Sequence, residues 1–119
     1  MNFKETQSIY LQIANRIEDE ILQGKFHEEE RIPSVREYAA EVEVNVNTIV
    51  RSYEFLQNQE IITNRRGLGY FVTDGAKSQI KKNRKEIFMK ELVPEFFKQI
   101  ELLDISFDEI IKWKNNHND

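Results

Sequence analysis

Two short motifs constrain the fold of this chain more than any other feature of its sequence. The first, residues 32–37, reads Ile-Pro-Ser-Val-Arg-Glu and places Ser34 three residues before Glu37. That spacing is typical of a capping box, in which each side chain bonds a backbone N–H at the start of an α-helix. The second, residues 65–72, reads Arg-Arg-Gly-Leu-Gly-Tyr-Phe-Val and predicts a β-hairpin with glycines at its tip.

A further helix fits between these motifs. After a turn at residues 43–44, Asn45 is a suitable N-cap for a helix that runs to about residue 58. Helical spacing puts Ile49 and Tyr53 on one face, which we expect to be buried. The opposite face carries Asn47, Thr48 and Arg51. Two helices joined by a turn and followed by a hairpin form a winged helix-turn-helix, so we predict a mostly α fold with a small β-hairpin.

The segment before the first motif predicts one more helix. Residues 6–22 show the three-and-four apolar spacing of an amphipathic helix, with Thr6 or Ser8 as its cap and Gly24 at its end. Residues 26–32 read as a connector with a short strand at its end. We therefore predict a winged helix-turn-helix domain over residues 1–75.

Beyond that domain, residues 76–119 predict a short helical tail. Pro94 interrupts the apolar stripe and should kink or divide the helix, and Ser106 opens a last helix with a second capping box. Such helices cannot bury their large apolar side chains alone, so we expect a dimerisation region covered by a second copy of the chain. The residues we assign to it are Ile87, Phe88, Leu92, Phe96, Ile100, Ile110 and Trp113.

The composition narrows the classes of function. The chain has no cysteine and only two histidines, His27 and His117, which lie far apart. We expect no metal, no cofactor and no catalytic residues, because ligand spacings and acid–base constellations are missing. No apolar run approaches the roughly 20 residues that would span a bilayer, so we expect a cytoplasmic protein without membrane contact.

Net charge alone argues weakly against a nucleic acid partner. The chain carries −4, and residues 1–75 hold eight Lys and Arg against thirteen Asp and Glu, whereas nucleic acid binders are usually basic. Five arginines nevertheless fall within the helix-turn-helix and hairpin: Arg31, Arg36, Arg51, Arg65 and Arg66. If the acids at 18–20 and 28–30 face away from them, one side of the domain can still face phosphate.

Four segments in combination carry a family resemblance: residues 32–39 (IPSVREYA), 44–49 (VNVNTI), 51–53 (RSY) and 66–72 (RGLGYFV). Together they resemble the DNA-binding domain of the GntR family of bacterial transcription regulators. The segment Ile-Tyr-Leu-Gln-Ile-Ala at 9–14 and the short tail are similar to its YtrA-type branch, in which a helical tail dimerises the protein in place of a large effector domain.

The resemblance implies a homodimer that binds double-stranded DNA at an inverted-repeat operator, usually as a repressor and often beside genes for ATP-driven transport. It leaves the effector unknown. By position it implies DNA contacts from Ser34, Arg36, Asn47, Thr48, Arg51, Arg66 and Gly67. We add Asn45, because a helix start presents free amides to phosphate, and Arg65, which lies beside the hairpin tip.

The sequence departs from the family pattern at four positions. Val46 stands where proline is common, Val50 where many members have arginine, and Glu29 and Glu43 where glycine is frequent. The missing arginine changes the expected base preference, because a bidentate arginine–guanine contact contributes about 1–3 kcal/mol of discrimination. A glutamate at 43 strains the turn if the backbone there needs positive φ.

Each proposed contact also has a purely structural interpretation. Asn47 and Thr48 can simply cap a helix, Arg51 can be a solvated charge, and the arginines at 65 and 66 can keep a hairpin soluble. Arg36 can form an ion pair with Glu37 or Glu41. Phe55 can pack beneath the predicted hairpin, which is the wing of the winged helix, or against the tail. Which of the two wing arginines faces DNA stays open, since alternate strand residues point to opposite sides.

A different class of function competes with DNA binding. A winged helix can dock a protein through the same face, and the overall acidity of the chain favours that alternative. Titration against duplex DNA at two salt concentrations separates them, because phosphate contacts weaken steeply with salt.

Overall fold

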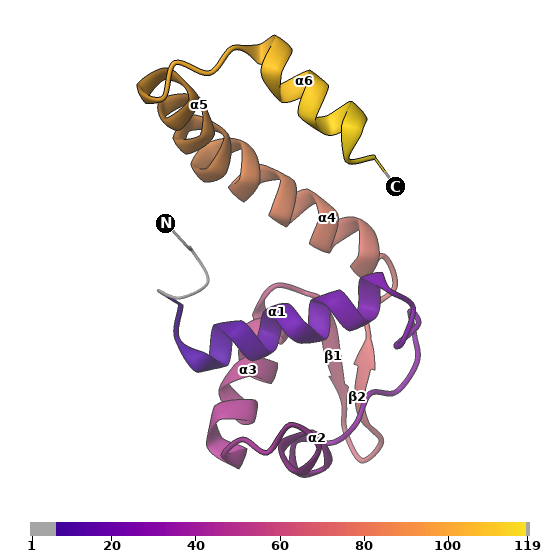
Figure 1. Ribbon diagram of the computed structural model, residues 1–119. Coiled ribbons are helices and arrows are strands. Elements are labelled where there is room, and N and C mark those ends of the chain that lie inside the picture. The colour runs from indigo at the N-terminus through magenta and orange to yellow at the C-terminus, as the bar shows by residue number, and fades with distance from the viewer. Residues whose placement is uncertain (1–6, 119) are drawn as a thin grey trace. The chain divides into compact units, whose positions relative to one another are not determined.

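The computed structural model describes residues 7–118, so Thr6 lies outside the described residues. The chain divides after Lys81 into two compact units. The first unit contains three helices, a β-hairpin and the first turns of a fourth helix (Figure 1). These elements are α1 (Ile9–Leu22), α2 (Val35–Val42), α3 (Val46–Asn58), β1 (Ile62–Arg65), β2 (Gly69–Val72) and the start of α4 (Ala76–Ile87). The predicted mostly α fold with one hairpin is confirmed.

Helices α1, α2 and α3 pack around a core that includes the buried carboxylate of Glu20. The Tyr38 hydroxyl donates to the Glu20 carboxylate at 2.6 Å, and Lys25 Nζ lies 2.8 Å from the same carboxylate. Glu20 is only 7% exposed. Burial and this neighbouring acid raise the pKa of Tyr38, so the phenol stays protonated and keeps donating. One member of the acidic cluster at 18–20 therefore stabilises the core.

Both predicted caps of the helix-turn-helix are present. The Ser34 hydroxyl accepts from the Glu37 N–H at 3.1 Å, and the Glu37 carboxylate accepts from the Ser34 N–H at 2.9 Å. The Asn45 side chain accepts from the Asn47 N–H at 2.8 Å. Between the helices, Glu43 has φ +56°, the left-handed conformation that favours glycine. The strain expected at this turn is therefore present.

This strain gives a stability prediction. A non-glycine residue in the left-handed conformation costs about 1–2 kcal/mol, which a glycine would not. Glycine also gives the unfolded chain more conformational entropy, and this offsets about 0.5–1 kcal/mol of the gain. We expect Glu43→Gly to raise the free energy of unfolding by about 0.5–1 kcal/mol, measured as a higher urea midpoint at unchanged slope. Glu54→Gly, at an exposed position within α3, should instead lower it by about 1 kcal/mol. Equal losses in both variants would contradict the assigned strain.

The wing is the hairpin of β1 and β2 with a third segment paired to β2. β1 and β2 pair in antiparallel register across the loop at 66–68, with Arg65 opposite Gly69. The connector before α2 supplies this third segment, because Arg31 forms an antiparallel bridge with Phe71 of β2. The short strand expected there is reduced to this single bridge. Directly opposed residues share a face of a sheet, so Arg31, Arg65, Gly69 and Phe71 lie on the same face of the wing.

The compact unit extends six residues past the boundary expected from the sequence. Ala76 and Ile80, in the first turns of α4, are fully buried in the same core as α1 and α3. The sequence pattern changes at residue 75, but the packing continues to Lys81.

The second unit begins at Lys82 and contains the rest of α4, a π-helical stretch η2 (Phe88–Leu92), α5 (Val93–Leu102) and α6 (Phe107–Asn116). Pro94 lies in the first turn of α5, directly after the π-helical stretch. It does not divide the helical segment, because α4, η2 and α5 follow one another without a break; the hydrogen-bond pattern changes to π-helical just before the proline. Ser106 and Glu109 form the expected capping box of α6.

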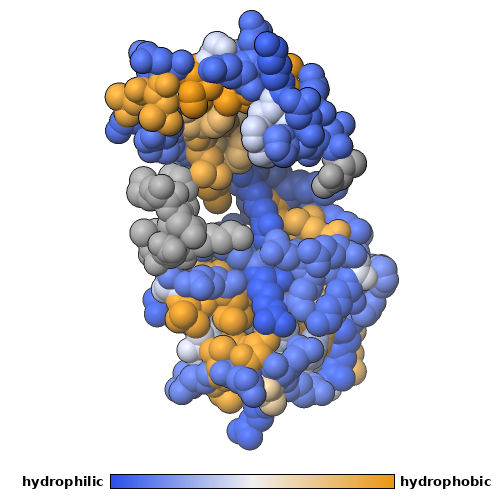
Figure 2. Space-filling view, viewed as in Figure 1, coloured by the Kyte–Doolittle hydropathy of each residue, from blue (hydrophilic) through white to orange (hydrophobic). Residues whose placement is uncertain are grey.

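The tail leaves much apolar surface uncovered, and Figure 2 shows apolar side chains gathered on it. Five of the assigned dimerisation residues are exposed: Ile87, Phe88, Leu92, Phe96 and Trp113. Ile110 is half-buried, and Ile100 is only 9% exposed. We therefore assign Ile100 to packing within the tail, because a side chain already covered adds little on dimerisation.

Candidate nucleic-acid interface

The polar face of α3 borders a shallow hollow of about 320 Å³. Asn47, Thr48 and Arg51 form one wall, as the helical spacing predicts. The start of α1 forms the other wall with Ser8, Ile9 and Tyr10. Ser8 caps α1 by position, but its side chain makes no capping hydrogen bond. The structure thus brings the start of the first helix beside the residues proposed to read DNA.

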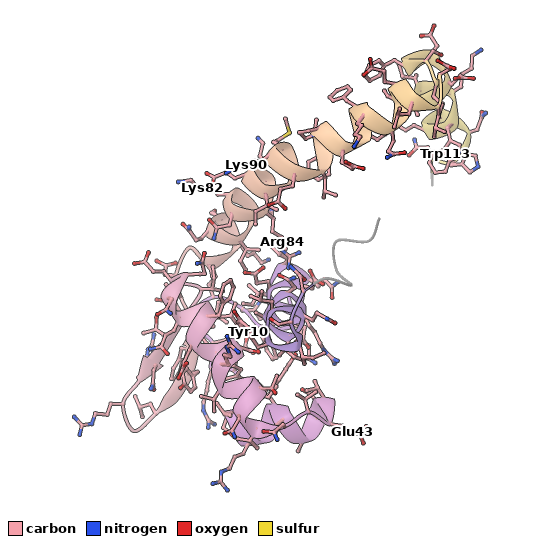
Figure 3. The ribbon with its side chains drawn as sticks, turned by 90° about the vertical axis from the view of Figure 1, so that its left-hand side faces the viewer. Tyr10, Glu43, Lys82, Arg84, Lys90 and Trp113 are labelled. Carbon is pink, nitrogen blue, oxygen red and sulfur yellow. The ribbon has the colours of Figure 1, made fainter. Side chains whose placement is uncertain are left out.

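Arg51 lies on an aromatic ring of that first helix. Its guanidinium carbon is 4.1 Å from the ring centroid of Tyr10, which Figure 3 labels beside α3. Phe55 contacts the same ring edge-on at 6.4 Å between centroids. Sequence reasoning offered packing beneath the wing or against the tail for Phe55, and the structure adds an aromatic contact from the start of α1.

The start of α2 presents Arg36 without an acidic partner. The two glutamates that could pair with it are engaged elsewhere: Glu37 in the capping box and Glu41 at 3.6 Å from Lys25. Hydrogen bonds from Ser34 hold the pKa of Glu37 below its usual value, and Arg31 lowers it further. Among the described residues, no carboxylate forms an ion pair with Arg36, so its exposed guanidinium is available to an external anion.

The wing presents arginines in two different settings. The Arg65 guanidinium carbon lies 4.1 Å from the ring centroid of Phe71, on one face of the hairpin. Arg66 is exposed in the loop at 66–68 and has no ionic partner in residues 7–118. Gly67 has φ +79°, and a side chain there would meet nothing within 4 Å. The tip is therefore open enough for a groove or a phosphate to approach its backbone.

Arg31, which the sequence analysis left out of its proposed DNA contacts, lies on the wing. Its side chain crosses Gly69, so that Arg31 Nε lies 2.9 Å from where a Cβ on that glycine would stand. Arg31 and Arg65 thus share a face of the wing near its tip. The missed signal was the strand expected near residue 32, since pairing with β2 carries residue 31 onto the hairpin. For Tyr10 no local signal exists, because it lies 41 positions from Arg51.

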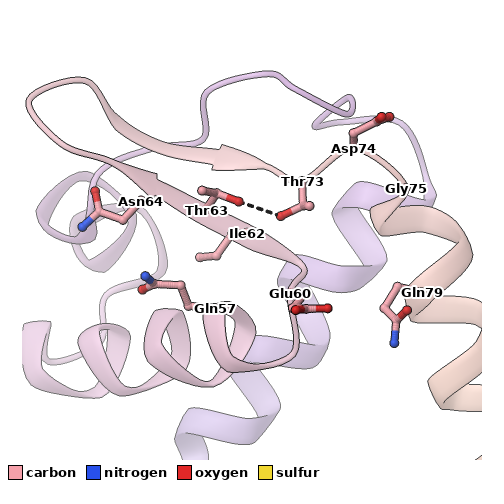
Figure 4. Close-up of a pocket in the computed structure, with 9 residues that line it drawn as sticks. All are labelled: Gln57, Glu60, Ile62, Thr63, Asn64, Thr73, Asp74, Gly75 and Gln79. Atoms are coloured by element: carbon pink, nitrogen blue, oxygen red, sulfur yellow. Dashed lines mark hydrogen bonds between the residues drawn. The ribbon is translucent and has the colours of Figure 1, made fainter.

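A second hollow lies elsewhere, beside β1 (Figure 4), with a volume of about 560 Å³. It is open and mostly polar, with Glu60, Asp74 and Gln79 in its lining. Thr63 and Thr73 in its wall are hydrogen-bonded to each other at 3.0 Å. We find no acid–base pair or nucleophile there that resembles a catalytic constellation.

Residues 7–118 contain no group of three His, Asp or Glu side chains that could hold a metal ion. None of the helices described is long and apolar enough to cross a bilayer.

Comparison with known proteins decides the family. The sequence pattern described as "Bacterial regulatory proteins, gntR family" matches residues 9–72, from the start of α1 to the end of β2. The chain belongs to the GntR family. Its members are DNA-binding transcriptional regulators, so the protein is a regulator of that kind and not an enzyme.

Two curated relatives match almost the whole chain. The HTH-type transcriptional regulator YhcF of Bacillus subtilis is 33% identical over 110 residues, covering 92% of this chain and 89% of that protein. The HTH-type transcriptional repressor YtrA of the same organism is 26% identical over 110 residues, covering 92% and 84%. The resemblance to the YtrA-type branch is therefore confirmed.

Two solved structures extend this result. A GntR-family transcriptional regulator from Bacteroides thetaiotaomicron is 56% identical, with a TM-score of 0.78 over 92% of this chain and 95% of that one. AraR(DBD), solved in complex with operator ORR3, is 30% identical, with a TM-score of 0.51 over 54% of this chain and 77% of that chain. The first match covers both units and supports the winged helix-turn-helix fold of the first unit, which we call the winged unit. The second match covers about half of the chain.

Proposed function

We propose that the protein is a homodimeric repressor that binds an inverted-repeat operator. The observation that carries this proposal is the set of exposed arginines on the winged unit that have no ionic partner among the described residues, beside a polar helix face. Arg36, Arg51 and Arg66 come from three different elements, and none pairs with a described carboxylate. An exposed guanidinium group without an ionic partner can donate two parallel hydrogen bonds to a phosphate or to the edge of a guanine.

We assign the reading of bases to α3. In helix-turn-helix proteins the second helix lies in the major groove with its N-terminal residues at the base edges. Here those residues are Asn47, Thr48 and Arg51. Asparagine suits adenine and arginine suits guanine, whereas Val50, half-exposed on the same helix, offers only an apolar contact such as a thymine methyl group.

Phosphate contacts fall to the flanking elements. The starts of α2 and α3 present backbone N–H groups beside Ser34 and Asn45, with Arg36 adjacent. In the wing, Arg66 and the backbone at Gly67 approach the neighbouring groove. Arg65 lies over the ring of Phe71, on the same face of the wing as Arg31, so we assign both arginines to the DNA phosphates beside that groove.

The tail supports dimerisation. Phe88, Leu92, Val93, Phe96 and Phe97 line an apolar hollow of about 460 Å³. Large apolar side chains exposed together mark an interaction surface, and a symmetric homodimer is the commonest way to cover one. Two copies then present two reading helices about one helical turn of DNA apart, which requires an inverted repeat. Occupancy of such a site in a promoter blocks transcription.

The test is a footprint on selected DNA. Duplexes enriched from a random library by the wild-type protein should share an inverted repeat, and cleavage protection should cover both half-sites. The half-site centres should lie about 10 base pairs, or a multiple, apart. Protection of a single half-site would refute the dimeric arrangement on an inverted repeat. Failure to enrich any duplex would refute the proposal as a whole and favour a protein-binding winged helix.

A further inference from the structure

Tyr10, at the start of α1, is held to α3 at its backbone and at its ring. The Ser52 hydroxyl donates to the Tyr10 carbonyl oxygen at 2.7 Å, and Ser52 is fully buried. Phe55 meets the ring edge-on at 6.4 Å between centroids. The Arg51 guanidinium carbon lies 4.1 Å from the ring centroid. The ring therefore has a fixed place beside the reading helix.

This arrangement restricts a side chain that is otherwise mobile. An exposed arginine samples many rotamers, and fixing it on binding costs conformational entropy. A guanidinium stacked on a tyrosine is attracted to the ring face and keeps its N–H edge available for hydrogen bonds. No carboxylate among the described residues pairs with Arg51, so the ring is the contact that orients it.

We propose that Tyr10 is a positioning residue for sequence discrimination. It holds Arg51 in the orientation that reads its base, so specificity depends on the first helix as well as on the helix-turn-helix. The start of α1 is then the second wall of the reading surface, as the hollow between Ile9, Tyr10 and Asn47 indicates. The inference rests on the proposed function, because it assigns a role within the same interface.

The test compares Tyr10→Phe, which keeps the ring, with Tyr10→Leu, which removes it. The probes are a duplex selected by the wild-type protein and a random duplex of the same length. We expect Tyr10→Leu to reduce the ratio of the two affinities by about threefold to tenfold. Tyr10→Phe should change that ratio less than twofold, by about the error of such a comparison. With Arg51→Ala already present, Tyr10→Leu should have no further effect.

Three binding results would overturn the inference. The first is that Tyr10→Phe reduces the affinity ratio as much as Tyr10→Leu does, which would assign the hydroxyl to phosphate. The others are that Tyr10→Leu weakens binding to both duplexes equally, or that its effect adds to that of Arg51→Ala.

A spectroscopic readout separates failure of the inference from failure of the proposed function. The Arg51 side-chain protons in the DNA-free protein should carry an upfield ring-current shift that Tyr10→Phe keeps and Tyr10→Leu removes. Absence of the shift in a protein that selects a duplex overturns the inference alone. If no duplex is selected, the proposed function fails, and the inference fails with it.

Discussion

Removal of residues 82–119 should leave a folded monomer that binds its operator about 100-fold or more weakly than the full chain. The winged unit keeps its core in this truncation, because Ala76 and Ile80 remain in place. What it loses is the link between two half-site contacts, and such linkage raises avidity by about 10²–10⁴-fold. Sedimentation reports the assembly state, and titration of the selected duplex reports the affinity.

A second truncation, of residues 76–119, provides a sharp comparison. It removes Ile80, which is fully buried, and loss of such a side chain costs about 2–5 kcal/mol. We expect this shorter chain to be much less stable than the one that ends at Lys81.

A full-length Phe96→Glu variant should be monomeric, like the truncated chain that ends at Lys81, because it places a charge on the proposed dimer surface. A truncated protein that stays dimeric would refute the role given to the tail.

Arg51→Ala should reduce affinity for the selected duplex about 10- to 100-fold while changing affinity for random duplex much less. The reason is that a bidentate contact to guanine contributes about 1–3 kcal/mol of discrimination, whereas loss of a phosphate contact weakens all sequences alike. Arg51→Lys should lose most of the same discrimination, because a lysine keeps the charge without the planar fork.

Three variants serve as comparisons for this result. Arg36→Ala and Arg66→Ala should weaken both duplexes about evenly, as expected of residues that bind phosphate. Lys112→Ala, which removes one exposed positive charge from α6 outside the proposed interface residues, should change neither affinity by more than about twofold, since a solvent-exposed charge that makes no phosphate contact is screened by salt. Equal losses on both duplexes for Arg51→Ala would show that this residue only grips the backbone.

Local features of this fold were predictable from the sequence. The capping box at Ser34 and Glu37, the cap at Asn45 and the strain at Glu43 each depend on residues within a few positions of one another. The hairpin was likewise predictable, because its strands flank a glycine-containing loop. Helical periodicity also placed Asn47 and Arg51 on an accessible face. Such features follow from backbone geometry, and little tertiary context changes them.

The features that escaped prediction join distant parts of the chain. The stack of Arg51 on Tyr10 and the crossing of Gly69 by Arg31 depend on how separate elements pack, which spacing alone does not encode. The burial of Ile80 moved the end of the compact unit for the same reason. Ile100 fits the apolar stripe of the tail, yet its surface is covered within the chain. Periodicity identifies an apolar face but does not identify what covers it.

The central claim is that the exposed arginines of the winged unit outweigh a net charge of −4 when the protein meets DNA. The most direct measurement is the affinity for the selected duplex as a function of salt. A dimer that neutralises six or more phosphates should lose about 10³-fold in affinity between 50 and 200 mM salt, with a straight log–log plot. An affinity that barely changes over this range, or no measurable binding at the lower salt, would contradict the account.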